Sequence, residues 1–373
     1  MKNEITRRDW LNRSATVLGG SFIGAMTGIN PLSGASARPS ANVPVRMMFN
    51  ENPYGPSQVA RRAMRKAFGE SNLYSMRNAK EEFKNLMAKL NGVSPDHIAV
   101  GFGSGEILKK AALMNGIDKG ELVSPALTFE TINRFAKTMK SNVKRIPMDD
   151  NIGIDLDRMS RNVGRNTKLV YLCNPNNPTG SLMSTGHLES FCKSISKKAI
   201  VFVDEAYHEY VTHPNYRSMI DLVKEEYNVI VSRTASKVHG LAGLRVGFAI
   251  TTPEIAKRLE SYLTDSLNIV GLRAAISSYN DIKFQAHSIE QNNRAKKVVT
   301  DHLNNKGIQY LDSQSNFIFI KTGIEISDFQ PEMEKHGVLV GRPFPPYTKW
   351  CRLSMAKPEE MERFTNGLDR VLG

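Results

Sequence analysis

The chain has 373 residues, of which 40% are hydrophobic and 23% charged, and this composition is typical of a globular protein with one large or two medium domains. An excess of 50 Lys and Arg over 37 Asp and Glu gives a net charge of +13, which can attract nucleic acid. The basic residues are scattered, so we expect a basic solvated surface and no nucleic-acid partner. The three cysteines are widely spaced and form no metal motif, so we expect no metal.

The first 37 residues have the features of an export signal. Arg7 and Arg8 precede a Gly/Ala/Ser-rich apolar stretch over 14–29, and Ala35-Ser36-Ala37 is a small-residue cleavage pattern. This order resembles a twin-arginine signal peptide, which predicts a periplasmic protein that begins near Arg38. The alternative is an ordinary amphipathic first helix on a cytoplasmic protein. The apolar stretch is too short and too rich in glycine for a stable membrane anchor.

Between residues 90 and 250, short apolar runs alternate with segments of helical period. The runs cover 97–100, 168–173, 199–203 and 228–231. Strands that are apolar throughout predict a sheet covered on both faces, and the intervening helices predict crossover connections. The fold class is therefore α/β with a largely parallel sheet.

The pattern changes after residue 265. A polar stretch of helical period over 274–305 precedes apolar runs at 316–320, 337–340 and 351–354, which predicts a smaller α+β domain. We predict an N-terminal arm that forms part of this small domain over 38–75. The large domain would cover 76–264 and the rest of the small domain 265–373.

Ligands of parallel sheets bind at the carboxyl ends of the strands, where four polar segments converge in this chain. They cover 103–106, 174–180, 204–207 and 232–237. The first, Gly-Ser-Gly-Glu, opens a helix, so its N–H groups can bind a phosphate. A plain strand-to-helix turn is the alternative.

The other three segments offer side chains with specific chemistry. The amide of Asn177 can donate to a phenolate oxygen, and the carboxylate of Asp204 needs a partner such as a protonated pyridine nitrogen. A simple turn and a helix N-cap are the alternatives. Lys237 follows two hydroxyl residues and precedes Arg245, which suits a nucleophilic amine beside an anion site. A lone lysine is more often a surface residue, and only the convergence of the segments favours the nucleophile.

The motifs GSGE, NPNNPTG, DEAY, SRTASK and GLRVGF, in this order, resemble the class I/II aminotransferases of fold type I, and look closest to the histidinol-phosphate aminotransferase group. The resemblance runs from about Asn50 to the C-terminus. It implies pyridoxal phosphate as the cofactor, a homodimer, and small-molecule substrates. It also implies a ping-pong transfer of an amino group between an amino acid, or an amine such as histidinol phosphate, and a 2-oxo acid.

The resemblance also implies a role for individual residues. Lys237 would be the Schiff-base lysine and proton shuttle, Asp204 would bond the pyridine nitrogen, and Tyr207 and Asn177 would bond the phenolate oxygen. The ring of Phe129 would stack on the cofactor. The residues that would line the cofactor phosphate are Ser104, Gly105, Glu106, Thr234, Ser236 and Arg245, with Tyr74 reaching it across the dimer interface.

Three residues would bind the substrate beside Asn177. Tyr54 would face it, Arg352 would grip its α-carboxylate, and Arg342 would meet a substrate phosphate. The segment Val340-Gly341-Arg342 has one residue more before its arginine than the usual pattern of the group, which leaves recognition of a phosphate open.

Two other functions remain open from the sequence. A decarboxylase or lyase of the same fold would keep the cofactor and break a different bond. A non-catalytic exported binding protein would keep only the scaffold, and the presence of Lys237 together with Asp204 and Arg352 argues against it.

Overall fold

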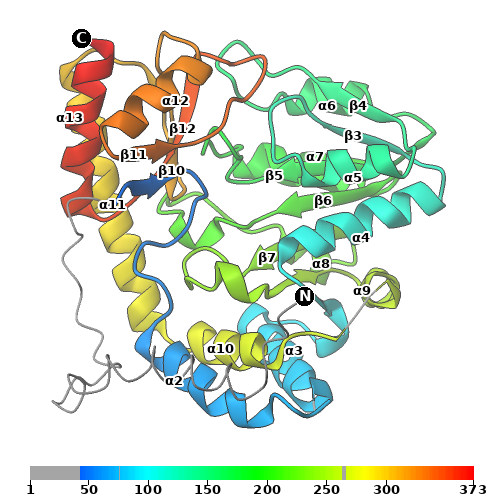
Figure 1. The fold of residues 1–373 in the computed structure, drawn as a ribbon. Helices are drawn as coiled ribbons and strands as arrows, with labels where there is room; N and C mark the ends of the chain where they lie inside the picture. The colour runs from blue at the N-terminus through cyan, green and yellow to red at the C-terminus, as the bar shows by residue number, and fades with distance from the viewer. Residues whose placement is uncertain (1–42, 75, 263–265) are drawn as a thin grey trace, which may run out of the picture. The chain divides into compact units, whose positions relative to one another are not determined.

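The computed structural model describes residues 43–74, 76–262 and 266–373. The predicted twin-arginine signal over residues 1–37 lies outside the described residues. Residues 44–373 form one unit, and the elements named below belong to it (Figure 1). None of the helices within the described ranges combines the length and hydropathy that crossing a membrane requires.

A seven-stranded sheet organises the larger part of this unit. Its order is β2 (Ile98–Gly101), β8 (Gly247–Ile250), β7 (Val229–Thr234), β6 (Ile200–Asp204), β5 (Thr167–Cys173), β3 (Glu121–Pro125) and β4 (Val143–Ile146). Strands β7, β6, β5, β3 and β4 are parallel to one another, while β8 is antiparallel to both of its neighbours. The predicted, largely parallel sheet is confirmed.

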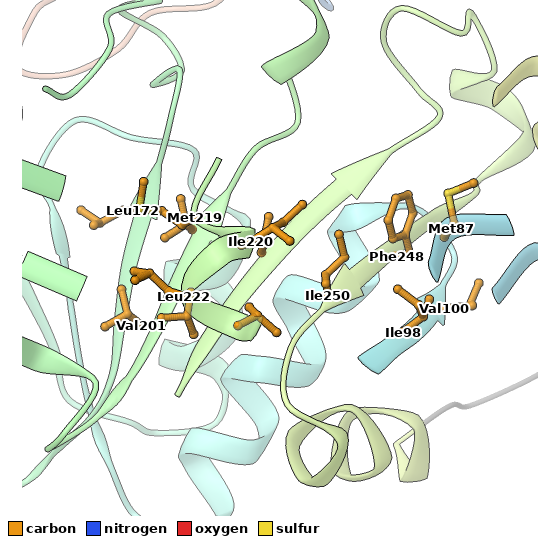
Figure 2. Packing of buried hydrophobic residues seen from close by; sticks show 14 of the residues in the cluster. Met87, Ile98, Val100, Leu172, Val201, Met219, Ile220, Leu222, Phe248 and Ile250 are labelled. Carbon is orange, nitrogen blue, oxygen red and sulfur yellow. The ribbon is translucent and has the colours of Figure 1, made fainter. Parts of the chain in front are cut away.

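Helices cover both faces of this sheet. Successive residues of a strand point to opposite faces, so each strand contributes side chains to two cores. Val201 and Val203 face one core and Phe202 faces the other. The first core includes α3 (Met76–Asn91), α6 (Leu156–Arg161), α7 (Thr185–Ile195), α8 (Ile220–Lys224) and α10 (Ile269–Tyr279), and the second includes α4 (Ser104–Ile117), α5 (Thr131–Thr138) and α9 (Pro253–Ser261). Figure 2 shows part of the first core, where side chains of β2 and β8 meet Met87 of α3.

A second group of strands draws on both ends of the described chain. β1 (Val45–Met47) pairs in parallel with β11 (Val338–Val340). β10 (Phe317–Lys321) lies antiparallel between β9 (Tyr310–Leu311) and β12 (Trp350–Ser354). These strands share a separate core with α11 (Ile282–Asn305), α12 (Ile326–Lys335) and α13 (Met361–Leu372). This part agrees with the smaller α+β part of the predicted fold.

Two segments differ from the sequence prediction. The helical stretch over 274–305 is two helices, because the Asp281 side chain accepts a hydrogen bond from the Phe284 N–H and so begins α11 separately from α10. Helix α2 (Gln58–Ala67) packs on α10, and its Ala60 belongs to the core of the seven-stranded sheet, although its segment was predicted to be an arm and part of the small domain. The domain boundaries themselves stay predictions.

A buried ion pair fixes the carboxyl ends of β6 and β7. Arg233 donates to Glu205 Oε2 from Nη2 at 2.9 Å and from Nε at 3.2 Å. Ser218 Oγ and the Met219 N–H donate to the same carboxylate. Buried charges need such complete pairing, so this contact holds the adjacent ends of the two strands in register.

Candidate active site

A cavity of about 980 Å³ lies at the carboxyl ends of β5, β6 and β7. Its lining includes Cys173, the last residue of β5. Residues 48–51, which are far from these strands in the sequence, line the same cavity. The structure brings most predicted site residues together here: Ser104, Gly105, Glu106, Phe129, Asn177, Asp204, Tyr207, Thr234, Ser236, Lys237, Arg245, Arg342 and Arg352.

Lys237 offers a nucleophilic amine to this cavity. Its Nζ donates to the Asn50 carbonyl at 3.2 Å and lies 5.4 Å from the centre of the Tyr207 ring. Burial, followed by the nearby Arg352 guanidinium, lowers the pKa of Lys237 to about 8, against the opposing effect of Asp204. A lower pKa leaves more of the amine neutral at physiological pH, and the neutral amine is the form that attacks a carbonyl.

Asp204 places a carboxylate at the end of β6. It accepts hydrogen bonds from Ser232 Oγ at 2.8 Å and from Tyr171 OH at 3.3 Å, and burial raises its pKa to about 6. Within the described residues it has no ion-pair partner, since Ser232 and Tyr171 are neutral. A carboxylate in this setting fits a protonated ring nitrogen, which would supply the missing positive charge.

Tyr207 is held by two amides. Its hydroxyl oxygen accepts from Asn177 Nδ2 at 3.1 Å and from Asn50 Nδ2 at 3.0 Å. Burial raises the pKa of Tyr207, so the hydroxyl keeps its proton. With both contacts accepted, that proton is available to an oxygen in the cavity.

Arg352 extends this network from β12. Its Nη1 donates to Asn177 Oδ1 at 2.9 Å, whereas its buried Nε has no hydrogen-bond partner among the described residues. Arg352 and Arg342 lie 5.3 Å and 4.3 Å from the centre of the Phe344 ring. The extra residue before Arg342 therefore does not remove this arginine from the cavity.

The turn before α4 forms an anion cradle. Gly103 has a φ of 74°, and a Cβ there would lie 2.4 Å from the Arg245 guanidinium. A Cβ on Gly247 would lie 2.3 Å from the Ser104 nitrogen. The N–H groups of Ser104 and Gly105 begin α4, and neither has an acceptor among the described residues. Only glycine at these positions leaves the helix end open to a phosphate.

Hydroxyl groups line the cradle, and a carboxylate caps the turn that forms it. Thr234 Oγ1 donates to Ser236 Oγ at 2.9 Å, and Arg245 Nη1 lies 3.3 Å from the same Ser236 oxygen. The Glu106 carboxylate accepts from the Phe102 N–H at 2.7 Å, so it caps the turn with its side chain. The Glu106 N–H donates to the Gly103 carbonyl at 3.2 Å, so Glu106 stabilises the turn, and the predicted contact of Glu106 with the phosphate stays a prediction.

Two predicted residues do not line the cavity. The Tyr54 ring packs edge-on against His287, with centroids 5.1 Å apart, and Tyr74 is 97% exposed. Asn50 and Glu51, which precede Tyr54 by four and three residues, line the cavity in its place. The role of Tyr74 across a dimer interface stays a prediction.

The sequence analysis gave no role to three residues that hold the predicted ones, although Ser232 belongs to the predicted polar segment 232–237. Asn50 reaches Tyr207 and Lys237, while Ser232 and Tyr171 hydrogen-bond Asp204. Strand pairing is the signal that could have found Ser232, because its strand position lies directly opposite Asp204. Nothing in the local sequence marks Asn50 as a partner of a residue 157 positions away.

Comparison with known proteins identifies the family. Residues 44–368 match the model of the class I and II aminotransferases. The chain belongs to this family. Histidinol-phosphate aminotransferase 2 of Pasteurella multocida is 32% identical over 88% of this chain and 90% of its own length.

Solved structures agree with the sequence match. A protein from Erwinia carotovora atroseptica is 33% identical and has a TM-score of 0.85, over 89% of this chain and 97% of that one. The histidinol-phosphate aminotransferase of Sinorhizobium meliloti, solved with pyridoxal phosphate, is 25% identical with a TM-score of 0.81, over 88% and 91% of the two chains. This aminotransferase is thus a fold type I transaminase that depends on pyridoxal phosphate, and the lyase and binding-protein alternatives lose their support.

The residues of the cavity fit this cofactor. Once bound, pyridoxal phosphate supplies an electron sink for the pair that remains when the substrate Cα–H bond breaks. We expect the cradle of α4 and Arg245 to hold its phosphate, and Asp204 to keep its ring nitrogen protonated. Lys237 would hold the cofactor and move the proton at Cα, while Arg352 would orient the substrate through a paired contact with its carboxylate.

Replacing Gly247 with alanine tests the cradle. The new Cβ meets the backbone of residues 103 and 104, so the turn must shift and the phosphate contacts weaken. We expect the Kd of the cofactor-free enzyme for pyridoxal phosphate to rise at least about tenfold, the loss of one charge-assisted hydrogen bond. Binding of pyridoxal, which lacks the phosphate, should change little. Absorbance titration measures both.

Gly243→Ala is the matched control for this variant, because a Cβ at Gly243 has nothing within 4 Å. It should bind both ligands as the wild type does. Wild-type affinity of Gly247→Ala for pyridoxal phosphate, or an equal loss of pyridoxal binding, would contradict the cradle.

The lowered pKa of Lys237 predicts a pH dependence. Only the neutral amine is acylated, so acetylation of Lys237 in the cofactor-free enzyme should rise with pH and reach half its maximum near pH 8. An ordinary lysine does so at about pH 10.4. Arg352→Gln removes a cation that lowers the pKa, so it should move the Lys237 midpoint to higher pH. Mass spectrometry of the peptide quantifies the label, and a midpoint equal to that of an ordinary lysine would contradict the prediction.

Proposed function

We propose that this transaminase acts on an amine that carries a phosphate, with histidinol phosphate as the first candidate donor and a 2-oxo acid as the acceptor. Two lines of support converge. The Pasteurella multocida relative is named for that substrate. Arg342 lines the cavity beside Arg352, so two arginines are available for the phosphate of the donor and for the carboxylate of the 2-oxo acid, which occupy the site in turn.

The charge balance around these arginines supports an anionic substrate. Neither Arg342 nor Arg352 forms an ion pair with a carboxylate among the described residues, and Arg134 lines the same cavity. The acidic group that acts on Arg342 is Glu130, which already binds Arg145 through both carboxylate oxygens. The single observation that carries the proposal is this surplus of guanidinium groups in a cavity that holds the nucleophilic lysine.

A comparison of histidinol phosphate with histidinol, which has the same amine and no phosphate, tests recognition of the phosphate. We expect the wild type to react with histidinol phosphate at a much higher kcat/KM than with histidinol, measured by stopped-flow absorbance of the cofactor. Arg342→Gln should lower kcat/KM for histidinol phosphate by about 10- to 100-fold, the value of a charge-assisted hydrogen bond, and leave histidinol unchanged.

Arg158→Gln serves as the control, since Arg158 pairs with Asp155 on the surface and does not line the cavity. It should leave both substrates unaffected. Equal kcat/KM for the two amines in the wild type, or an equal loss for both in Arg342→Gln, would contradict recognition of the phosphate by Arg342.

We also propose that the mature enzyme is an exported homodimer. The family match begins at residue 44, after the predicted signal and its cleavage pattern. Phe68, Leu73 and Tyr74 are exposed at 63%, 53% and 97%, which gives an apolar surface near α2 for a second copy to cover. A partner at this surface would bring the predicted Tyr74 contact within reach.

Native mass spectrometry of enzyme recovered from a periplasmic fraction tests both proposals. The expected mass is that of two chains, each beginning near Arg38. Intact chains that start at Met1 and stay in the cytoplasm would contradict export, and a monomer at micromolar concentration would contradict the dimer.

A further inference from the structure

A buried carboxylate and a buried imidazole lie behind the two turns that present Tyr207 and Lys237. Glu209 belongs to the short 3-10 helix η3 (His208–Tyr210), two residues after Tyr207, and His239 follows Lys237 by two residues. Glu209 Oε1 lies 3.7 Å from His239 Nε2. The Glu209 side chain is 9% exposed, the His239 side chain is fully buried, and neither lines the cavity.

Glu209 carries a negative charge in this position. Burial alone would raise its pKa, but His208 and His239 outweigh burial and hold the pKa well below its usual range. His208 Nε2 lies 3.2 Å from Glu209 Oε1. Neither carboxylate oxygen has a hydrogen-bond partner among the described residues, so the carboxylate depends on the two imidazoles for compensation.

His239 is fixed on its other side by α10. Its Nδ1 lies 3.0 Å from Ser278 Oγ, and its ring centroid lies 4.0 Å from that of Tyr279. Both ring nitrogens thus face oxygen atoms, with a hydrogen bond to Ser278 on one side and a longer, 3.7 Å approach to Glu209 on the other. The ring connects the turn after Lys237 to α10 and to η3.

The turn between Lys237 and His239 has little freedom elsewhere. The Gly240 N–H donates to the Lys237 carbonyl at 2.9 Å, and a Cβ on Gly240 would lie 2.3 Å from the Gly55 carbonyl oxygen. Asn52 Nδ2 donates to the Val238 carbonyl at 2.7 Å. The N-terminal segment therefore encloses this turn from one side, and the contact of His239 with Glu209 determines its place from the other.

We propose that Glu209 and His239 are a positioning pair that sets the Lys237 amine relative to the Tyr207 hydroxyl. The inference rests on the predicted role of Lys237 in transamination. Each member of the pair is two residues from a side chain of the cavity, so a change in their separation moves the two turns against each other. Proton transfer by Lys237 is sensitive to such a shift, because a displacement of about 1 Å can cost a hundredfold in rate.

Single and double variants test the pair. His239→Gln and Glu209→Gln should each lower kcat about tenfold while KM stays within about twofold, since the substrate contacts of Arg352 are untouched. The kcat of the double variant should be no lower than that of the less active single variant, because either substitution alone already breaks the pair. The Lys237 acetylation midpoint should rise above pH 8 in each variant, because an amine displaced from Arg352 and from its buried position regains a higher pKa.

His187→Gln and Asp157→Asn are the matched controls, because this histidine and carboxylate lie 3.0 Å apart with exposed side chains on α7 and α6. They should leave kcat, KM and the acetylation midpoint unchanged.

Two results would overturn the proposal. One is an unchanged midpoint together with unchanged kcat in both single variants. The other is a lower thermal unfolding temperature with wild-type kcat, which indicates a pair that only stabilises the fold. Acetylation requires neither substrate nor cofactor, so it reports on the pair even if histidinol phosphate is not the donor. Turnover by Lys237→Ala would instead refute the role of Lys237 itself.

Discussion

Burial of opposite charges at one edge of a sheet is the constraint on which the site depends. Helices cover both faces of the seven-stranded sheet, so groups at the ends of its central strands are withdrawn from water. Burial acts on Asp204 and Lys237 in opposite directions: it raises the pKa of the carboxyl to about 6 and lowers that of the amine to about 8. The same feature of the fold thus prepares a hydrogen-bond acceptor for the protonated cofactor ring and a nucleophile for its aldehyde.

One chain of hydrogen bonds joins the two parts of the molecule across this edge. It runs from Arg352 on β12 to Asn177 after β5, on to the Tyr207 hydroxyl, and then to Asn50. Ser354, also on β12, donates to the Asn50 side chain and closes the circuit. The residue expected to orient the substrate is therefore connected to the residue expected to bond the cofactor, and neither can move without disturbing the other.

The sequence predicted those features that are local along the chain. Each run of apolar residues from 97 to 231 became a strand of the large sheet, and the polar segments after them met in one cavity because parallel strands end at a common edge. It did not predict the strands β3 and β4, nor β8, whose short run Gly247–Ile250 is antiparallel to its neighbours β2 and β7. Asn50 and Ser232 were given no role, since their partners are distant in sequence. Tyr54 was predicted to face the substrate, but Asn50 and Glu51, just before it in the chain, line the cavity.

The arginines that would bind an anionic substrate also affect the pKa of Lys237. Burial, together with Arg342, lowers the pKa of Arg352, and Arg352 in turn is second only to burial in lowering the pKa of Lys237. An anionic substrate that neutralises Arg352 and Arg342 would weaken this repulsion and let the pKa of Lys237 rise. A lysine released from the cofactor would then be a better base at the moment when it must take the proton from Cα. The substrate charge that gives affinity would also prepare the amine for proton transfer.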